Sequence, residues 1–332
     1  MKILYIGGTG EISASCVLES HALGHEVTIF NRQQTEQPLP AGVKQITGDL
    51  AADSPYASLG NARFDAVCQF FAFDLARIER DVQTFSGRTG QYVFISTASA
   101  YAKPIDRFER ITERTPLENP FWEYSQKKAQ MERRLLEAQR GGSLPVTIVR
   151  PSHTYRRRVP SAIGTGDWTV RRLRAGRPLI VHGDGTSLWT LTHASDFARP
   201  FARLLGNSQA LGEDFHITGE GVHTWDEILT QLARAVGVEP KLVHVASDTL
   251  VRYDPAWKGP LHGDKAPSTL FDNSKVTRVA GPFPTRMSIE AGFASAVKEV
   301  LARLEKGSGQ DAAFDAKIDR IIREQAPDVP LG

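Results

Sequence analysis

The chain has 332 residues, 41% of them hydrophobic and 23% charged, so it can bury the core of one large or two modest globular domains. Its net charge of +2 is too near neutral for a general nucleic-acid or membrane surface. The two cysteines, Cys16 and Cys68, stand in apolar stretches without a CxxC pattern, which argues against a disulfide framework and a zinc site and indicates a reducing compartment.

The N-terminal apolar run ends at Gly7 and Gly8, which is too short for the core of a signal peptide. No other stretch is apolar for the length that a bilayer requires. We therefore expect a cytoplasmic protein that binds neither membranes nor nucleic acid.

Short apolar segments alternate with longer, helix-like segments along the first half of the chain. The apolar segments predict buried parallel strands at residues 3–6, 27–30, 65–71, 92–96 and 146–149. The longer segments predict helices at residues 12–23 and 125–139. This alternation is typical of βαβ units, so we expect an α/β fold with a doubly wound parallel sheet and helices on both faces.

The pattern changes after Pro151. It predicts an amphipathic helical piece at 168–173, a strand at 215–218, and helices at 225–236 and 288–304. We expect residues 1–155 to form the sheet domain, with segments around 188–220 returning to it. Residues 156–187 and 221–332 should then form a smaller lobe over the strand ends.

The first predicted strand runs directly into the sequence GGTGEIS, residues 7–13. Gly7 permits a tight turn, and Gly10 lets the backbone approach a pyrophosphate, whose charge would lie at the helix N-terminus. Ser13 replaces the usual third glycine. An ordinary glycine turn is the alternative, but the order strand, turn, helix favours a Rossmann dinucleotide site that Glu11 and Ile12 also line.

Two later segments are candidates for the adenosine end of this site. Asn31 and Arg32 end the second strand, where NAD-binding proteins usually have an acidic residue; a guanidinium suits the 2′-phosphate of NADP. An arginine stacked on the adenine is the alternative, so the cofactor is NAD or NADP. Asp49 and Leu50 follow a third short strand, and Asp49 either faces the adenine amine or is a plain turn residue.

Tyr124 alone among the seven tyrosines is followed by a lysine four residues later, Lys128. On a helix this spacing puts both side chains on one face. An adjacent ammonium favours the phenolate, so Tyr124 could exchange a hydroxyl proton while hydride moves to or from the cofactor. Thr97 and Ser99 follow the strand at 92–96, at the edge where ligands of α/β sheets bind, and could contact the same substrate oxygen.

Four motifs in order, the GGTGxxS loop, the segment STASAY at 96–101, Tyr124-x-x-x-Lys128 and Arg150-Pro151, resemble the extended short-chain dehydrogenase/reductase family, in its NAD-dependent epimerase/dehydratase group. The resemblance implies that Thr97 is the catalytic hydroxyl, Tyr124 the acid/base, and Lys128 the residue that holds the nicotinamide ribose. It further implies that Pro151 contacts the cofactor and that the smaller lobe binds substrate.

The chain departs from the family pattern at the substrate end, as an atypical member. Ala98 and Ser99 replace the Asp-Glu pair of the dehydratases, which argues against that activity. Trp189 stands where nucleotide-sugar epimerases have a pyrophosphate-clamping arginine, and could instead stack on a sugar. His153 replaces a substrate-contacting asparagine; a substrate contact and a structural role stay open. We expect Ser99, His153 and Trp189 to bind substrate.

Two arginine clusters, at residues 156–158 and at residues 171–177, lie in the second half. A solvated basic face, a site for an anionic substrate group and an interface all stay open for them. In the family two long helices pair in a dimer, and residues 125–139 supply Met131, Leu135 and Leu136 to such a contact. We therefore expect a homodimer.

The motifs favour an NAD(P)-dependent oxidoreductase or epimerase. Its expected partner is a small molecule, a carbohydrate-like or glycosylated secondary alcohol, and no metal is expected. The alternative is a non-catalytic regulator or RNA-binding relative that keeps the dinucleotide fold. The retained pair of Tyr124 and Lys128 argues against that alternative.

Overall fold

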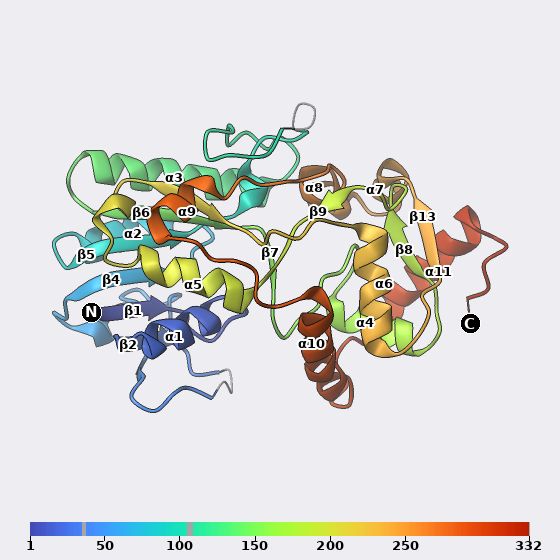
Figure 1. Cartoon of the computed structure of the whole chain (residues 1–332), viewed down its shortest axis with the longest axis horizontal. Helices are drawn as coiled ribbons and strands as arrows, with labels where there is room; N and C mark the ends of the chain where they lie inside the picture. The colour runs from blue at the N-terminus through green and yellow to red at the C-terminus, as the bar shows by residue number, and fades with distance from the viewer. Residues whose placement is uncertain (35–37, 105–108, 332) are drawn as a thin grey trace.

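The structure is a computed structural model that describes residues 1–34, 38–104 and 109–331. A sheet covered by helices on both faces forms one side of the molecule, and a smaller lobe forms the other (Figure 1). Within the described residues, no helix is both long enough and apolar enough to cross a membrane.

Seven parallel strands form the sheet, in the order β11-β6-β5-β4-β1-β2-β3. Their bounds are β1 Lys2–Ile6, β2 Glu26–Asn31, β3 Lys44–Thr47, β4 Phe64–Gln69, β5 Thr89–Ile95, β6 Val146–Pro151 and β11 Asp214–Ile217. The central strands are apolar on both faces because helices cover both. The strand order reverses between β1 and β4, and ligands of such sheets bind at the carboxyl ends of strands at this point.

The helices pack on the two faces of the sheet. Helices α1 (Ser13–Ala22), α5 (Ala194–Leu204) and α9 (Ser274–Ala280) cover one face. Helices α2 (Leu75–Phe85) and α3 (Glu123–Arg140) cover the other. Met131 and Leu135 of α3 are fully buried in this second core. Contrary to the expectation from sequence, these two side chains therefore cannot form a contact between subunits.

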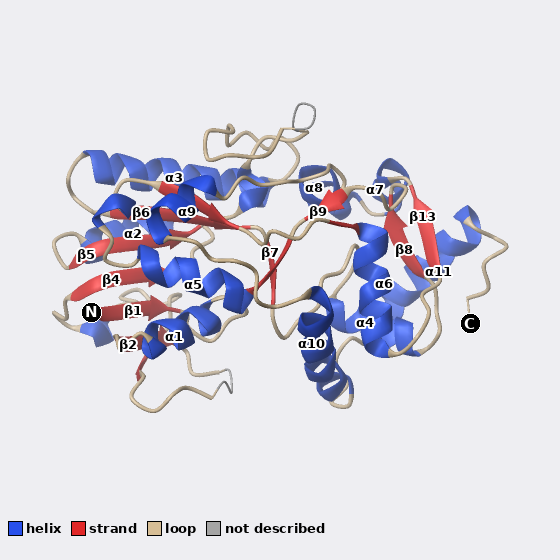
Figure 2. Cartoon of the chain, in the orientation of Figure 1, coloured by secondary structure: helices blue, strands red, loops and turns tan. Residues whose placement is uncertain are grey.

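The smaller lobe has an apolar core of its own. Its helices and its short strands lie on the side of the molecule away from the large sheet (Figure 2). The lobe contains α4 (Gly166–Arg174), β8 (Leu179–His182), α6 (Trp225–Val236), β13 (Leu242–Val245), α7 (Ser247–Tyr253), α10 (Ile289–Leu304) and α11 (Ala312–Gln325). Strands β8 and β13 pair in parallel. Helix α6 begins at a capping box of Thr224 and Glu227 and ends at Gly237, whose φ is 86°.

Short elements connect the two parts. Strand β7 (His153–Tyr155) pairs with β10 (Leu191–His193), and β9 (Leu188–Trp189) pairs with β12 (His223–Thr224). The remaining pieces are η1 (Ala57–Leu59), η2 (Ala98–Ala100), η3 (Ser208–Ala210), η4 (Pro255–Trp257), α8 (Lys258–Pro260) and η5 (Leu261–Lys265). Segment η5 is one turn of π-helix.

The expected fold class is confirmed, and most predicted strands and helices end within a few residues of the observed bounds. Strand β4 is the main difference, because it ends at Gln69 and leaves Phe70 and Phe71 in the following loop. Strand β11 pairs with β6 of the sheet, and helices α5 and α9 pack on one face of it.

The arginine cluster at 171–177 has a structural role that the sequence did not indicate. Arg171 and Arg172 of α4 pair with Asp315 of α11, and Arg172 also lies 3.0 Å from Asp319. Arg177 pairs with Asp319. Because Arg172 is fully buried, Arg171, Arg172 and Arg177 form an internal ion network that holds α4 to α11, whereas Arg174 of the same cluster is exposed.

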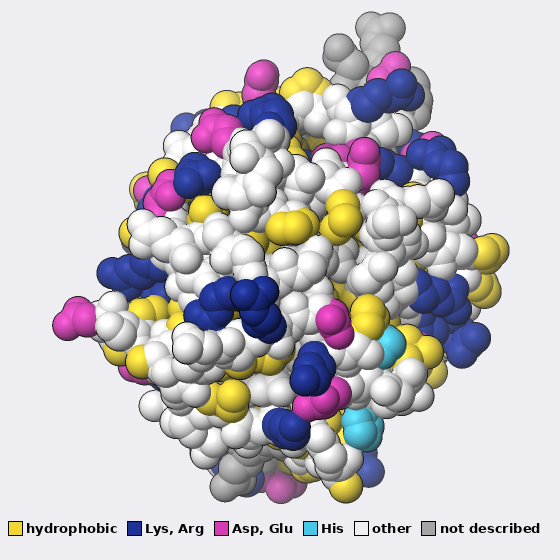
Figure 3. Space-filling view, turned by 90° about the vertical axis from the view of Figure 1, so that its left-hand side faces the viewer, with side chains coloured by type: hydrophobic (Ala, Val, Ile, Leu, Met, Phe, Trp, Pro, Cys, Tyr) yellow, Lys and Arg dark blue, Asp and Glu magenta, His cyan; other side chains and the backbone are white. Residues whose placement is uncertain are grey.

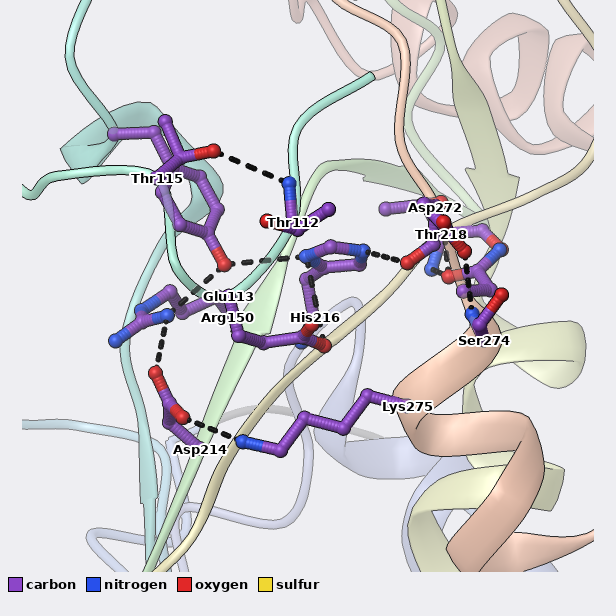
Figure 4. A network of polar contacts seen from close by, with 12 residues as sticks. Thr112, Glu113, Thr115, Arg150, Asp214, His216, Thr218, Asp272, Ser274 and Lys275 are labelled. Atoms are coloured by element: carbon purple, nitrogen blue, oxygen red, sulfur yellow. Dashed lines mark hydrogen bonds and ion pairs between the residues drawn. The ribbon is translucent and has the colours of Figure 1, made fainter. Parts of the chain in front are cut away.

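A second network lies at the edge of the sheet (Figure 4). Arg150 of β6 is 2% exposed, and its guanidinium lies 2.5 Å from a carboxylate oxygen of Glu132 in α3. The same guanidinium donates to the Tyr101 hydroxyl at 2.9 Å and lies 2.7 Å from Asp214, which also pairs with Lys275 at 2.8 Å. Arg150 thus ties β6 to α3 and to the edge strand β11, and Asp214 extends the network to Lys275 of α9.

Candidate functional site

One cleft of about 1050 Å³ opens at the carboxyl ends of the strands, around the switch point between β1 and β4. This volume suits a large cofactor. All twelve residues predicted to be catalytic or to bind the cofactor line it: Gly7, Gly10, Glu11, Ile12, Asn31, Arg32, Asp49, Leu50, Thr97, Tyr124, Lys128 and Pro151. The structure does not bring Ser99, His153 or Trp189 to the walls of this cleft.

The glycine loop has the backbone conformation that its sequence indicates. Gly7 and Gly8 have φ values of 108° and 91°, which favour glycine. A Cβ on Gly8 would lie 2.6 Å from Ile29 Cγ2, so the loop packs directly on β2. The Ser13 hydroxyl accepts a hydrogen bond from Gly10 N at 3.0 Å, next to the start of α1. Backbone N–H groups at such a helix start suit a pyrophosphate.

Arg32 and Asp49 lie on exposed loops at the far end of this cleft. Asp49 accepts a hydrogen bond from Ala51 N at 2.9 Å through one carboxylate oxygen, as a turn aspartate does. Asn31 accepts hydrogen bonds from Gln33 N and from the Gln45 side chain, both at 2.9 Å. The Asn31 carboxamide thus shapes the loop that presents Arg32.

Tyr124 and Thr97 meet at the opposite end. The Thr97 hydroxyl lies 2.9 Å from the Ser99 hydroxyl, and Thr97 and Tyr124 both line this end of the cleft. Ser99 in turn lies 2.8 Å from Ser125 Oγ and is 5% exposed. Ser99 is therefore a buried support that orients Thr97. Burial raises the pKa of Tyr124, and the neighbouring Thr97 hydroxyl opposes that rise.

Lys128 points into the same end of the cleft from one turn further along α3. Its ammonium donates to the carbonyls of Ala72 at 2.9 Å and Ile95 at 2.8 Å. An ammonium has three donors, so one remains for a ligand in the cleft. Burial lowers the pKa of Lys128 to about 8, although the Glu132 carboxylate opposes this shift.

The second arginine cluster, residues 156–158, lines the mouth of the cleft. The Glu11 carboxylate accepts hydrogen bonds from Arg157 N at 2.8 Å and Arg158 N at 3.3 Å. Arg303 donates to the Arg157 carbonyl at 2.9 Å. Glu11 thus ties the glycine loop to this segment of the chain.

His153 and Trp189 lie together between the two parts of the molecule. Their ring centroids are 6.2 Å apart, and Trp189 also packs against Trp225 at 5.6 Å. Trp189 is 2% exposed, so its ring has no broad open face for a sugar. Burial lowers the pKa of His153 to about 4, with the Lys265 ammonium adding to the effect. The imidazole is therefore neutral at pH 7.

Two aromatic side chains in the cleft were not recognised from the sequence. Phe71 and Phe73, in the loop after β4, are 52% and 47% exposed. Their rings meet edge to face at 5.0 Å, and the Lys128 ammonium lies 5.2 Å from the Phe73 ring. The apolar run at 65–71 was interpreted as strand to its end, which hid the exposed position of Phe71.

Known proteins show similarity to both the sequence and the fold. Residues 79–218 match the family model described as NAD dependent epimerase/dehydratase family. The chain is 28% identical over 260 residues to the chloroplast stem-loop binding protein of 41 kDa b of Arabidopsis thaliana, covering 73% of this chain and 65% of that protein. The chain thus spans slightly less than two thirds of that relative. A 2′-dehydrokanamycin reductase of Streptomyces kanamyceticus is 27% identical over 241 residues, covering 71% of this chain and 67% of the reductase.

Solved structures share the fold. A UDP-glucuronic acid 4-epimerase of Bacillus cereus in complex with NAD matches with a TM-score of 0.71 at 17% identity, covering 91% of this chain and 99% of the epimerase. A dTDP-glucose 4,6-dehydratase of Bacillus anthracis in complex with NAD matches with a TM-score of 0.72 at 19% identity, covering 92% of this chain and 98% of the dehydratase. The match of residues 79–218 to the family model and the shared sheet agree with the resemblance to the NAD-dependent epimerase/dehydratase group of the extended short-chain dehydrogenase/reductase family that the sequence motifs indicate.

Proposed function

We propose that this protein is an NAD(P)-dependent oxidoreductase or epimerase that transfers hydride at a secondary alcohol of a carbohydrate-like or glycosylated substrate. One observation carries the proposal. Tyr124 and Lys128 stand on one helix, with Thr97 beside them, at one end of a cleft whose other end is the glycine loop. This arrangement would place the reacting end of a dinucleotide beside a proton donor.

The described residues fit such a cofactor. The positive φ values of Gly7 and Gly8 keep the loop free of side chains, and the start of α1 offers N–H groups to phosphates. The third donor of Lys128 suits a ribose hydroxyl. When bound, the nicotinamide supplies the hydride acceptor or donor.

Side chains of this protein transfer the proton. Tyr124 takes the proton of the substrate hydroxyl in oxidation and returns it in reduction, while Thr97 donates a hydrogen bond in the same place. Burial raises the pKa of Tyr124, so the phenol is protonated in the free enzyme at neutral pH. The ammonium of Lys128, held by two carbonyls, and a cationic cofactor favour the phenolate when the site is loaded.

A screen tests the activity directly. Sugars and glycosides are incubated with NAD⁺ and with NADP⁺, and reduced-cofactor absorbance and product stereochemistry are followed together. Net reduction of the cofactor indicates a dehydrogenase, and an inverted carbinol without net reduction indicates an epimerase. A protein that binds neither dinucleotide contradicts the proposal.

We further propose a preference for NADP, based on the exposed Arg32 at the adenosine end. Replacing Arg32 with Asp should weaken NADP binding by about 10-fold or more, because a charge-assisted hydrogen bond contributes about 1.5–3 kcal/mol. NAD affinity should change far less. Titration of both cofactors checks this, and equal affinities before and after the change contradict it.

We propose a homodimer and a cytoplasmic location, as the family resemblance and the two free buried cysteines suggest. Helices α2 and α3 pack side by side, and the outer face of α3 is charged, with Lys127, Arg133 and Arg140 exposed. A contact there would be polar. Sedimentation should show a dimer at micromolar concentration, and a monomer alone contradicts the proposal.

RNA binding is a second candidate, favoured by the similarity to the chloroplast stem-loop binding protein. The face in Figure 3 carries separate groups of basic side chains with acidic ones between them, rather than one continuous basic surface. A stem-loop RNA that binds at physiological salt with a steep salt dependence would support this candidate. Hydride transfer without such binding would support the enzyme.

A further inference from the structure

Three charged residues form a cluster between the sheet and the smaller lobe; we call Lys103, Asp264 and Lys265 the lysine cluster. The Lys103 ammonium lies 2.9 Å from Asp264 Oδ1 and 3.3 Å from the Asp264 carbonyl. The Lys103 side chain is only 1% exposed and that of Asp264 is 19% exposed. Lys103 is thus already neutralised by this carboxylate.

Lys265, the next residue after Asp264, has a different environment. Among the described residues, its ammonium forms no hydrogen bond or ion pair, and its side chain is half-buried. Burial lowers the pKa of Lys265, and the Lys103 ammonium adds to this effect while Asp264 opposes it. A partly buried cation without a partner is costly, and an anion placed beside it would relieve that cost.

The lysine cluster lies beside the proton site. Asn119 donates from one carboxamide nitrogen to the carbonyls of Ser99 at 2.6 Å and Gly263 at 2.5 Å. This bridge joins η5, which carries Asp264 and Lys265, to the segment that carries Thr97. The Asp264 carboxylate also acts on Tyr124, since its charge contributes to raising the pKa of that phenol.

Close packing fixes η5 in this position. A Cβ on Gly259 would lie 2.4 Å from Trp122, and one on Gly263 would lie 3.0 Å from it. The Trp122 ring packs against that of Tyr124, with centroids 5.1 Å apart. The segment before Lys265 is therefore held against the start of α3, where Tyr124 stands.

Trp189 and His153, which also lie beside the lysine cluster, carry no negative charge. The Lys103 ammonium lies 5.5 Å from the centroid of Trp189, whose indole N–H is buried without a partner in the described chain. His153 is neutral at pH 7, because burial lowers its pKa to about 4. Two ammonium groups thus face one carboxylate, and the balance is positive.

We propose that the lysine cluster binds an anionic group of the substrate, a carboxylate or a phosphate, through Lys265. This inference rests on the proposed function, because it names the substrate class of that same site. The anion would lie next to Tyr124, on the substrate that exchanges its proton there. Substrates with a positive charge at this position are expected to bind poorly, because they would face two ammonium groups.

Four probes with matched rings test the charge requirement on the protein loaded with NAD(P)⁺. They are methyl glucuronide, which carries a carboxylate, glucose 1-phosphate, neutral methyl glucoside and cationic methyl glucosaminide. Calorimetry measures each affinity. At least one anionic probe should bind about 10-fold or more tightly than the glucoside, as a charge-assisted contact implies. The carboxylate and the phosphate probes show which anion is preferred.

The variants Lys265→Met and Lys241→Met identify the residue responsible. Lys241 is exposed on the same lobe and serves as the matched control. Lys265→Met should abolish the anionic preference and leave cofactor affinity unchanged, whereas Lys241→Met should keep both. No binding of either anion, or a preference that Lys265→Met retains, overturns the inference. Those outcomes concern affinity alone, so they are distinct from a failure of hydride transfer.

Discussion

Tyr124→Phe should lower turnover by about 10²- to 10⁴-fold, the loss typical of removing a positioned acid/base. The substitution removes the hydroxyl that we propose exchanges a proton with substrate and keeps the ring that packs on Trp122. Cofactor affinity should survive, because the glycine loop lies at the other end of the cleft. Steady-state kinetics and cofactor titration measure the two effects separately.

Three further variants show whether this result is specific to Tyr124. Lys128→Met should lower turnover and also weaken cofactor binding, because the third donor of its ammonium is lost. Thr97→Ala should lower turnover less than Tyr124→Phe does, since the Tyr124 hydroxyl itself remains. Tyr253→Phe removes an exposed hydroxyl that bonds Glu324, far from the cleft, and should leave turnover unchanged. Near wild-type turnover of Tyr124→Phe would mean that another group moves the proton.

Arg150→Met should destabilise the fold by about 3–5 kcal/mol, the usual cost of breaking a buried ion pair. Although burial disfavours its charge, the Glu132 carboxylate raises the pKa of Arg150. Glu132 is fully buried, so removing Arg150 leaves its carboxylate without this counter-charge. The Asp214 carboxylate keeps a counter-charge, because it remains paired with Lys275.

Urea denaturation measures this loss, with the exposed pair of Lys44 and Glu26 as the control. Those side chains are 65% and 44% exposed, so Glu26→Gln should lower the free energy of unfolding by less than about 1 kcal/mol. Similar unfolding midpoints for the two variants would show that the Arg150 network contributes little to stability.

The sequence was most informative where a motif and its element are local. The glycine loop follows β1 directly, and Tyr124 and Lys128 share one helix, so their positions required only the correct strand and helix assignments. The doubly wound parallel sheet followed from the same alternation of elements. The end of β4 was misplaced because Phe70 and Phe71 are as apolar as the strand before them.

Contacts between distant segments had no such signal. Arg171 meets Asp315 across 144 residues, and only the fold shows that the basic cluster is neutralised inside the smaller lobe. Lys103 meets Asp264 across 161 residues, so neither lysine of the lysine cluster was a candidate from sequence. Trp189 was expected to present an open ring, but its packing on Trp225 could be seen only once α6 was in place.

The central claim is that hydride and proton move together at the end of the cleft that Tyr124 and Thr97 form. Reduced nicotinamide cofactor with deuterium at its transferable position, mixed with the ketone of a substrate found in the screen, tests this most directly. Mass spectrometry of the product should find deuterium on the carbinol carbon for the wild type, and only traces of product for Tyr124→Phe over the same time. Product that lacks deuterium, or equal yields from the two proteins, would contradict the account.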